Sequence, residues 1–134
     1  MTTLKEIEGI GPVYAKKLNK AGVRGVGGLL KMGGTKKGRQ TLAKNTGFSA
    51  GTILEWVNRA DLFRVKGVGS QYSDLLEAAG VDTVAELAMR RPEALLEGMA
   101  KANKKLNKVN QLPALSQVKA WVKHAKSLKR AVEY

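Results

Sequence analysis

The sequence has no cysteine and few aromatic residues, and each shortage excludes a class of protein. Without cysteine among its 134 residues, the chain can form neither a disulfide nor a thiolate metal site. Only 5% of the residues are aromatic, so the 43% hydrophobic fraction must build a core from leucine, valine, isoleucine and alanine. No apolar run is long enough to span a bilayer, and the N-terminus has no apolar signal region. We therefore expect a cytoplasmic protein without a membrane partner.

Acidic residues are also scarce. The chain has 24 lysines and arginines against 11 aspartates and glutamates, which gives a net charge of +13. Such a positive field concentrates polyanions and accelerates their association with the protein. Nucleic acid is therefore the expected partner, and acidic proteins and anionic lipids are the alternatives.

An internal repeat is the strongest pattern in the sequence. The 24 residues from Ile7 align without gaps on the 24 residues from Val65, and nine positions are identical. No window alternates as a strand does, so we expect an all-α fold in which two pseudo-repeats, residues 1–60 and 61–134, pack into one compact helical domain. The identical pairs are Gly9/Gly67, Gly11/Gly69, Tyr14/Tyr72, Leu18/Leu76, Ala21/Ala79, Gly22/Gly80, Val23/Val81, Val26/Val84 and Leu29/Leu87.

Each copy predicts the same local structure. A short helix (residues 4–7 and 62–65) leads into a Gly-apolar-Gly turn, whose two glycines permit positive φ and close backbone approach. A second helix with apolar residues at helical spacing follows directly.

The ends of these helices carry capping signals. Pro12 suits the first helical position and Ser70 suits an N-cap. Gly22 and Gly80 suit the C′ position after the second helix. Thr83–Glu86 forms a capping box for the following helix.

The segment Gly9–Ala15 resembles the helix-hairpin-helix motif, in which Gly-apolar-Gly is followed, after three intervening residues, by alanine and then by an apolar pair. The motif occurs in DNA ligases, repair polymerases, Holliday-junction-binding proteins and DNA-uptake proteins. The second copy departs from it only at Ser73. The whole chain resembles a bacterial family of stand-alone tandem helix-hairpin-helix proteins of unknown function. The resemblance implies sequence-independent contact with the DNA backbone near the minor groove, sometimes with a cation on the turn carbonyls.

The first turn is the candidate phosphate site. Its backbone N–H groups and the open N-terminus of the following helix face outward together, and such groups bind phosphate oxygens. The candidate amides belong to Ile10, Gly11, Val13 and Tyr14, beside Gly9. Pro12 has no N–H to donate.

The two copies differ in charge. The first carries Lys16, Lys17, Lys20 and Arg24 after its turn, and we expect these cations to contact double-stranded DNA. The second carries carboxylates that would repel phosphate, so we expect a structural or protein-docking role there. The alternative is that these carboxylates merely stabilise a helix N-terminus. The candidate partner-binding residues are Gly67, Gly69, Asp74 and Glu77.

Two later helices are basic along one face. From Gly98 to Val132 the chain has no acidic residue and nine basic ones, which could follow a nucleic-acid backbone. The alternatives are a solvated lysine surface or a helix on an anionic membrane. The first face comprises Lys101, Lys104, Lys105 and Lys108, opposite Leu95, Met99, Ala102, Leu106 and Val109. The second comprises Lys119, Lys123, Lys126 and Arg130, opposite Leu115, Val118, Val122, Ala125 and Leu128.

Residues 41–49, continuing to Ile53 and Trp56, resemble a helix-turn-helix whose reading helix would be residues 50–60. The exposed positions of that helix offer little to base edges, so we favour a packing role. Trp56, Trp121, Tyr14 and Tyr72 are predicted to be core or helix-packing residues.

Catalysis has no support in the sequence. His124 is the only histidine, and neither a P-loop nor a zinc-binding motif is present. We expect no enzyme activity, catalytic residue, metal, cofactor or small-molecule substrate. Non-enzymatic DNA binding is the favoured function. A protein-interaction adaptor that docks through the second turn is the alternative, and RNA binding is the third choice.

Overall fold

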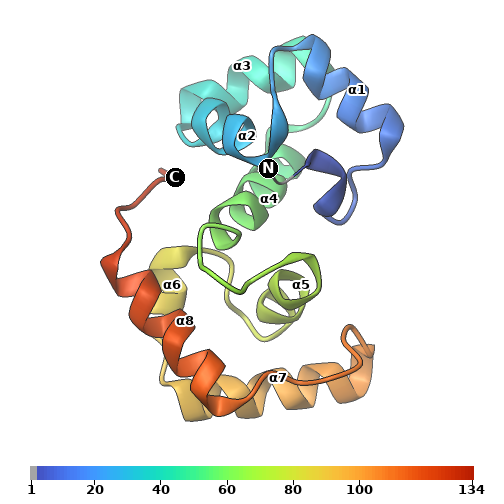
Figure 1. The fold of residues 1–134 in the computed structure, drawn as a ribbon. Coiled ribbons are helices and arrows are strands. Elements are labelled where there is room, and N and C mark those ends of the chain that lie inside the picture. The colour runs from blue at the N-terminus through green and yellow to red at the C-terminus, as the bar shows by residue number, and fades with distance from the viewer. Residues whose placement is uncertain (1–2) are drawn as a thin grey trace. The chain divides into compact units, whose positions relative to one another are not determined.

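The computed structural model describes residues 3–134, and over these residues the all-α prediction is confirmed (Figure 1). The described chain forms two compact units, which we call unit 1 (residues 3–61 and 131–134) and unit 2 (residues 62–130). The elements are the 3-10 helix η1 (Leu4–Glu6) and the helices α1 (Pro12–Lys20), α2 (Gly25–Gly33), α3 (Lys36–Thr46), α4 (Ala50–Leu62), α5 (Ser70–Ala78), α6 (Val84–Ala88), α7 (Pro92–Leu106) and α8 (Leu115–Ser127).

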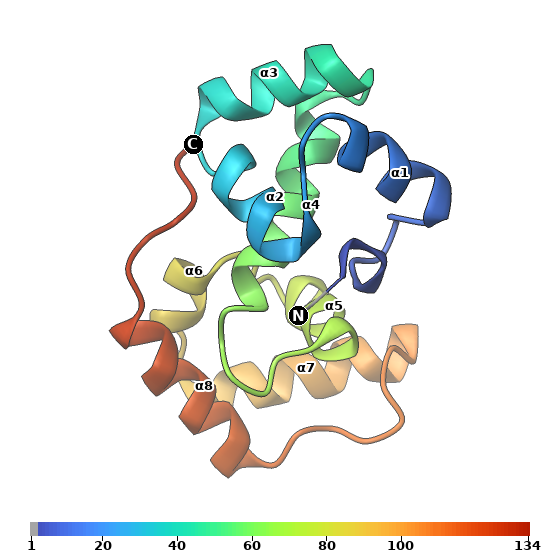
Figure 2. The ribbon, with the colours of Figure 1, turned by 45° about the horizontal axis from the view of Figure 1, so that its top comes forward.

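Unit 1 packs η1 against α1 and α2 against α3 around a core of aliphatic side chains (Figure 2). Leu18, Val23 and Leu29 from the first copy of the repeat are fully buried there. Ala15 and Leu18 are the buried residues of α1, and they anchor this helix in the unit. The other buried members include Leu4, Ile7, Ile10, Val26, Leu42, Ile53, Trp56 and Val57.

The last residues of the chain belong to unit 1, where a buried arginine binds them. The Arg39 guanidinium donates hydrogen bonds to the carbonyl oxygens of Gly33 (2.9 Å), Gly34 (3.1 Å) and Glu133. The Glu133 N–H donates in turn to the Gly34 carbonyl at 2.7 Å, and Val132 is buried. Figure 2 shows the C-terminus beside the start of α3. Arg39 thus satisfies carbonyls that α2 leaves open at its C-terminal end.

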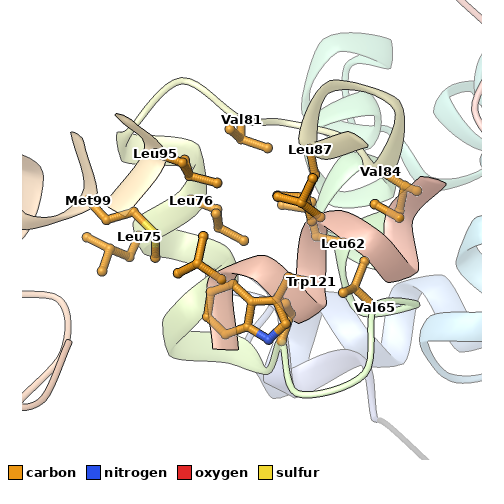
Figure 3. Close-up of a cluster of buried hydrophobic side chains, with 14 of the residues drawn as sticks. Leu62, Val65, Leu75, Leu76, Val81, Val84, Leu87, Leu95, Met99 and Trp121 are labelled. Atoms are coloured by element: carbon orange, nitrogen blue, oxygen red, sulfur yellow. The ribbon is translucent and has the colours of Figure 1, made fainter. Parts of the chain in front are cut away.

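Unit 2 packs α6 and α7 against α8, and α5 against α7. Its core surrounds Trp121, whose indole lies among aliphatic side chains between Leu76 and Val65 in Figure 3. Trp121 is 2% exposed and Trp56 in unit 1 is 5% exposed, which confirms that both tryptophans are core residues.

Most of the predicted caps are confirmed. Pro12 is the first residue of α1. Gly22 and Gly80 both have φ of +94°, in the left-handed region expected at C′. Thr83 caps α6 by accepting a hydrogen bond from the Glu86 N–H at 3.3 Å, but the predicted capping box is incomplete, because the Glu86 carboxylate accepts from the Asp82 N–H at 3.5 Å instead of the Thr83 N–H. The prediction for Ser70 is wrong by one residue, because Gly69 is the N-cap and α5 begins at Ser70.

Several predicted helix boundaries are wrong. Residues 62–65 form no separate short helix, since α4 continues through Leu62 into a turn. Helix α7 ends at Leu106, which is 49% exposed instead of buried, so Lys108 and Val109 lie beyond it. Asn107 adopts a left-handed conformation that ends this helix. Helix α8 ends at Ser127, so Arg130 is not on its basic face.

The segment that resembles a helix-turn-helix forms α3, a turn and α4. Gly47 lies at the turn with φ of +82°, and the Ser49 hydroxyl accepts the Thr52 N–H at 3.1 Å as the N-cap of α4. Trp56 on α4 is buried, in agreement with the predicted packing role. DNA reading by residues 50–60 stays a prediction.

A buried tryptophan supports the first glycine of each turn. Gly9 has φ of +94° and Gly67 has φ of +90°, a conformation that other residues rarely adopt. A Cβ atom on Gly9 would lie 3.3 Å from Nε1 of Trp56, and one on Gly67 would lie 3.0 Å from Nε1 of Trp121. Both the backbone conformation and the close indole therefore favour glycine over any other residue.

We predict that Gly9→Ala lowers the free energy of unfolding by about 1–3 kcal/mol, because alanine is strained at positive φ and its methyl group contacts the indole. Gly27→Ala is the matched control. Gly27 is exposed inside α2, and a Cβ there meets no atom within 4 Å. This variant should raise stability by about 0.5–1 kcal/mol. Urea unfolding followed by circular dichroism measures both, and equal effects of the two variants would contradict the structural role of Gly9.

Candidate nucleic-acid interface

The backbone hydrogen bonds of the first turn (residues 7–11) recur in the second turn (residues 65–69), 58 residues later. The Ile10 N–H donates to the Ile7 carbonyl at 3.1 Å, and the N–H of Val68 donates to the carbonyl of Val65 at the same distance. The first hydrogen bond of the following helix also recurs, at 2.9 Å in both copies. The Ala15 N–H donates to the Gly11 carbonyl, and the Ser73 N–H donates to the Gly69 carbonyl. The two turns thus expose their following helices in the same local geometry.

The second glycine of each turn has a different role from the first. Gly11 has φ of −85° and Gly69 has φ of −102°, both with an extended backbone. The expectation of positive φ for both glycines is therefore wrong for this position. A Cβ atom on Gly11 or Gly69 would meet no atom within 4 Å. The absence of a side chain leaves open space at the N-terminus of the helix.

Three backbone N–H groups are open at the first turn. The structure gives no hydrogen-bond partner within residues 3–134 to the N–H of Gly11, Val13 or Tyr14, and α1 has no side-chain N-cap. These three residues are exposed. The N–H of Ile10 is occupied by the Ile7 carbonyl, so the prediction that it binds phosphate is wrong. The open groups carry the positive end of the helix dipole and can hold an anion.

Basic residues follow these amides along α1 and at the start of α2. Lys16, Lys17 and Lys20 are exposed on α1, and Arg24 is exposed at the N-cap of α2. None of the four forms an ion pair with a carboxylate of the part of the chain that the structure describes. Their positive charge is therefore not neutralised locally. Lys17 also places its Nζ atom 5.6 Å from the ring centroid of Phe48.

The sequence analysis missed basic residues on α3. Lys36, Lys37 and Lys44 are exposed on this helix, which has no acidic residue in its first turn. A simple signal could have identified them: the chain from Gly9 to Leu54 contains nine basic residues and no acidic one. Unit 1 therefore carries a basic, acid-free segment, residues 9–54, which begins directly after the exposed Glu8 of the first turn.

An aromatic cluster connects the first turn of α1 to the α3–α4 turn and to α4. The ring centroids of Tyr14 and Phe48 are 4.8 Å apart, and those of Phe48 and Trp56 are 5.0 Å apart, both in edge-to-face geometry. Tyr14 also lies 6.0 Å from Trp56. Tyr14 remains 43% exposed, so it is a helix-packing residue at the surface and not part of the core.

The second turn is more covered. Tyr72 is half-buried against Trp121, with ring centroids 5.2 Å apart, and its hydroxyl donates to the Gln111 carbonyl at 3.2 Å. The Lys66 N–H donates to Nδ1 of His124 at 3.0 Å. Gln111 belongs to the longer connection that the first copy lacks.

The predicted docking residues of the second turn are not equally accessible. Glu77 is exposed, as are Gly67 and Gly69, whereas Asp74 is half-buried and takes part in an interaction with another group. Protein docking by these residues stays a prediction.

The basic faces of unit 2 are partly neutralised by neighbouring carboxylates. Lys119 lies 4.0 Å from Glu93, and Lys101 lies 3.8 Å from Glu97. Glu97 and Lys101 are an i, i+4 pair on α7 that the linear pattern could have shown, whereas the approach of Glu93 to Lys119 depends on how α7 packs against α8. Lys123 and Lys126 are exposed on α8, and Arg130 lies beyond the helix.

Two other kinds of feature are absent from residues 3–134. The structure brings together no group of three histidine, aspartate or glutamate side chains that could hold a metal ion. No helix in this range combines the length and the apolar character needed to cross a membrane.

Comparison with known proteins gives a family but no characterised relative. No curated protein and no solved structure matches the chain significantly. The sequence model of one family matches residues 8–128, which include every α-helix of the structure. The chain therefore belongs to the family described as Domain of unknown function (DUF4332).

Proposed function

We propose that the protein is a non-enzymatic DNA-binding protein, and that the first turn and α1 bind the phosphate backbone as a helix-hairpin-helix unit. The observation that carries this proposal is the set of open N–H groups on Gly11, Val13 and Tyr14, followed along α1 by exposed lysines that have no acidic partner among residues 3–134. Amide groups at a helix N-terminus bind phosphate directly, and the lysines add long-range attraction.

The contacts of this site favour recognition without sequence preference. Backbone N–H groups and lysine ammonium groups can reach phosphate oxygens, which are the same in every nucleotide. Reading a base sequence needs side chains that hydrogen-bond to base edges. The groups gathered at the first turn are backbone donors and cations, so the site holds DNA of any sequence.

The same chemistry favours binding without catalysis. Amides and ammonium groups donate hydrogen bonds, but they provide neither a nucleophile nor a general base for phosphodiester cleavage. The single histidine accepts a hydrogen bond at the second turn, in unit 2.

Unit 2 has a secondary role in this proposal. Its turn has the same backbone geometry, but α5 carries Asp74 and Glu77 at the positions of Lys16 and Asn19 in α1, and it carries no basic residue. Lys123 and Lys126 on α8 supply additional attraction for the backbone.

The first prediction of this proposal concerns salt. The logarithm of the association constant should fall linearly with the logarithm of salt concentration, with a slope of about −0.9 per phosphate contacted in duplex DNA and about −0.7 in single strands. Fluorescence anisotropy with labelled DNA measures this slope. Absence of binding even at low salt would exclude the proposed function.

A second prediction uses an intramolecular competitor for the phosphate. In Gly11→Asp, the new carboxylate sits at the N-cap and accepts hydrogen bonds from the N–H groups of Val13 and Tyr14. Stability should rise by a few tenths of a kcal/mol, since aspartate is a better N-cap than glycine. DNA affinity should nevertheless fall by about tenfold or more, because the amides are occupied and the charge repels phosphate.

Gly69→Asp is the matched control, since Gly69 is the N-cap of α5 with the same open space around it. It should stabilise the protein similarly and leave DNA affinity within about twofold, because the second turn is not the main site. Unfolding curves and anisotropy titrations are compared for the two variants. Equal losses of affinity would show that both turns bind DNA.

A third prediction separates local charge from total charge. Lys16→Glu with Lys20→Glu should lower DNA affinity by more than about tenfold at low salt, where screening is weak. Lys101→Glu with Lys105→Glu has the same spacing on α7 and changes the net charge equally, but should lower affinity much less. Titrations at low salt measure both. Equal losses would mean that the whole protein's charge, and not the first turn, governs binding.

A further inference from the structure

The first turn combines anion-binding groups with an exposed apolar surface. Val13 is 67% exposed and Tyr14 is 43% exposed, and the two residues are consecutive. Both also carry open N–H groups at the N-terminus of α1. A site for phosphate alone has no use for an exposed valine and tyrosine, because phosphate contacts are polar. A nucleotide, by contrast, places an apolar sugar and a flat base next to its phosphate.

The Tyr14 ring is held in place from behind. Its edge-to-face contact with Phe48 and its proximity to Trp56 hold one side of the ring against the rest of unit 1. Lys17 lies one turn further along α1, and its ammonium group lies over the Phe48 ring. The exposed part of the ring is therefore a rigid apolar surface beside both amides and cations. A rigid aromatic ring loses little side-chain entropy when a base stacks on it.

The second copy of the repeat lacks this surface. Gln71 stands at the position of Val13. Tyr72 stands at the position of Tyr14, but it is half-buried and its hydroxyl is bound to the Gln111 carbonyl. Of the two copies, only the first has the exposed apolar pair, and this pair lies on α1, the helix that also carries Lys16, Lys17 and Lys20. We therefore assign the apolar surface and the lysines to the same ligand.

We propose that Val13 and Tyr14 contact the sugar and base of the nucleotide whose phosphate the first turn holds, so that the protein prefers DNA with unpaired nucleotides to fully paired duplex. This inference rests on the proposed DNA-binding function and specifies its substrate. In a paired duplex the base faces are stacked on one another, whereas single strands and gaps expose them to an aromatic ring.

The test compares three ligands of equal sequence: a single strand, its fully paired duplex, and the duplex with a short gap. Tyr14→Leu should weaken binding to the single strand and to the gapped duplex by about tenfold, and should change binding to the paired duplex by less than about twofold. Tyr14→Phe keeps the ring and should retain the preference. Val13→Gln introduces the residue of the second copy and should give a smaller loss with the same ligand dependence.

The outcomes distinguish this inference from the proposed function. If the wild-type protein binds none of the three ligands, DNA binding itself is excluded. If it binds them but Tyr14→Leu and Val13→Gln weaken all three equally or not at all, the contact with unpaired bases is overturned while backbone binding stands. Tyr72→Leu is the control for loss of a packed tyrosine and should leave affinity unchanged. Should Tyr14→Leu fail to fold by circular dichroism, Val13→Gln decides the result, because its side chain is exposed.

Discussion

The structure depends on one contact, which occurs once in each unit: a buried tryptophan indole packed against a glycine of positive φ. Trp56 supports Gly9 and Trp121 supports Gly67. This glycine conformation reverses the chain so that the following N–H groups emerge at the start of a helix, and the indole excludes a side chain that would reopen the turn. The core and the candidate site are thereby coupled, because each buried tryptophan also contacts the glycine of the turn that leads into α1 or α5.

Charge distinguishes two turns that share this geometry. The cations beside the first turn have no acidic partner among the described residues, and an acid-free segment surrounds them. In unit 2 the helix after the turn is acidic, and Lys101 and Lys119 lie near glutamates. An exposed ion pair contributes little stability, but it removes much of the local field that a phosphate would experience. We therefore infer that the first turn is the main DNA contact.

The all-helical fold and most helix caps could be predicted from the sequence, because glycine, proline and the Thr83 cap act over a few residues. Contacts between helices could not, since the approach of Glu93 to Lys119 depends on how α7 packs against α8. Two local contacts were also overlooked, the occupied N–H of Ile10 in the turn that Ile7 closes and the i, i+4 pair of Glu97 and Lys101. The end of α7 was misplaced because residues 107–109 continue the apolar and basic spacing, while Asn107 leaves the helix in a left-handed conformation.

The choice of N-cap connects stability to the proposed function. Helices α3, α4 and α6 are capped by the hydroxyls of Thr35, Ser49 and Thr83. Helices α1 and α5 follow a glycine that supplies no side-chain acceptor. Replacing a good N-cap by glycine costs only a few tenths of a kcal/mol, whereas an occupied N-terminus cannot bind a phosphate. Because α5 shares the open cap but not the cations, the cap alone makes no binding site. A small loss of helix stability is compatible with DNA binding where a helix with open amides also carries exposed lysines that no described carboxylate neutralises, and α1 meets both conditions.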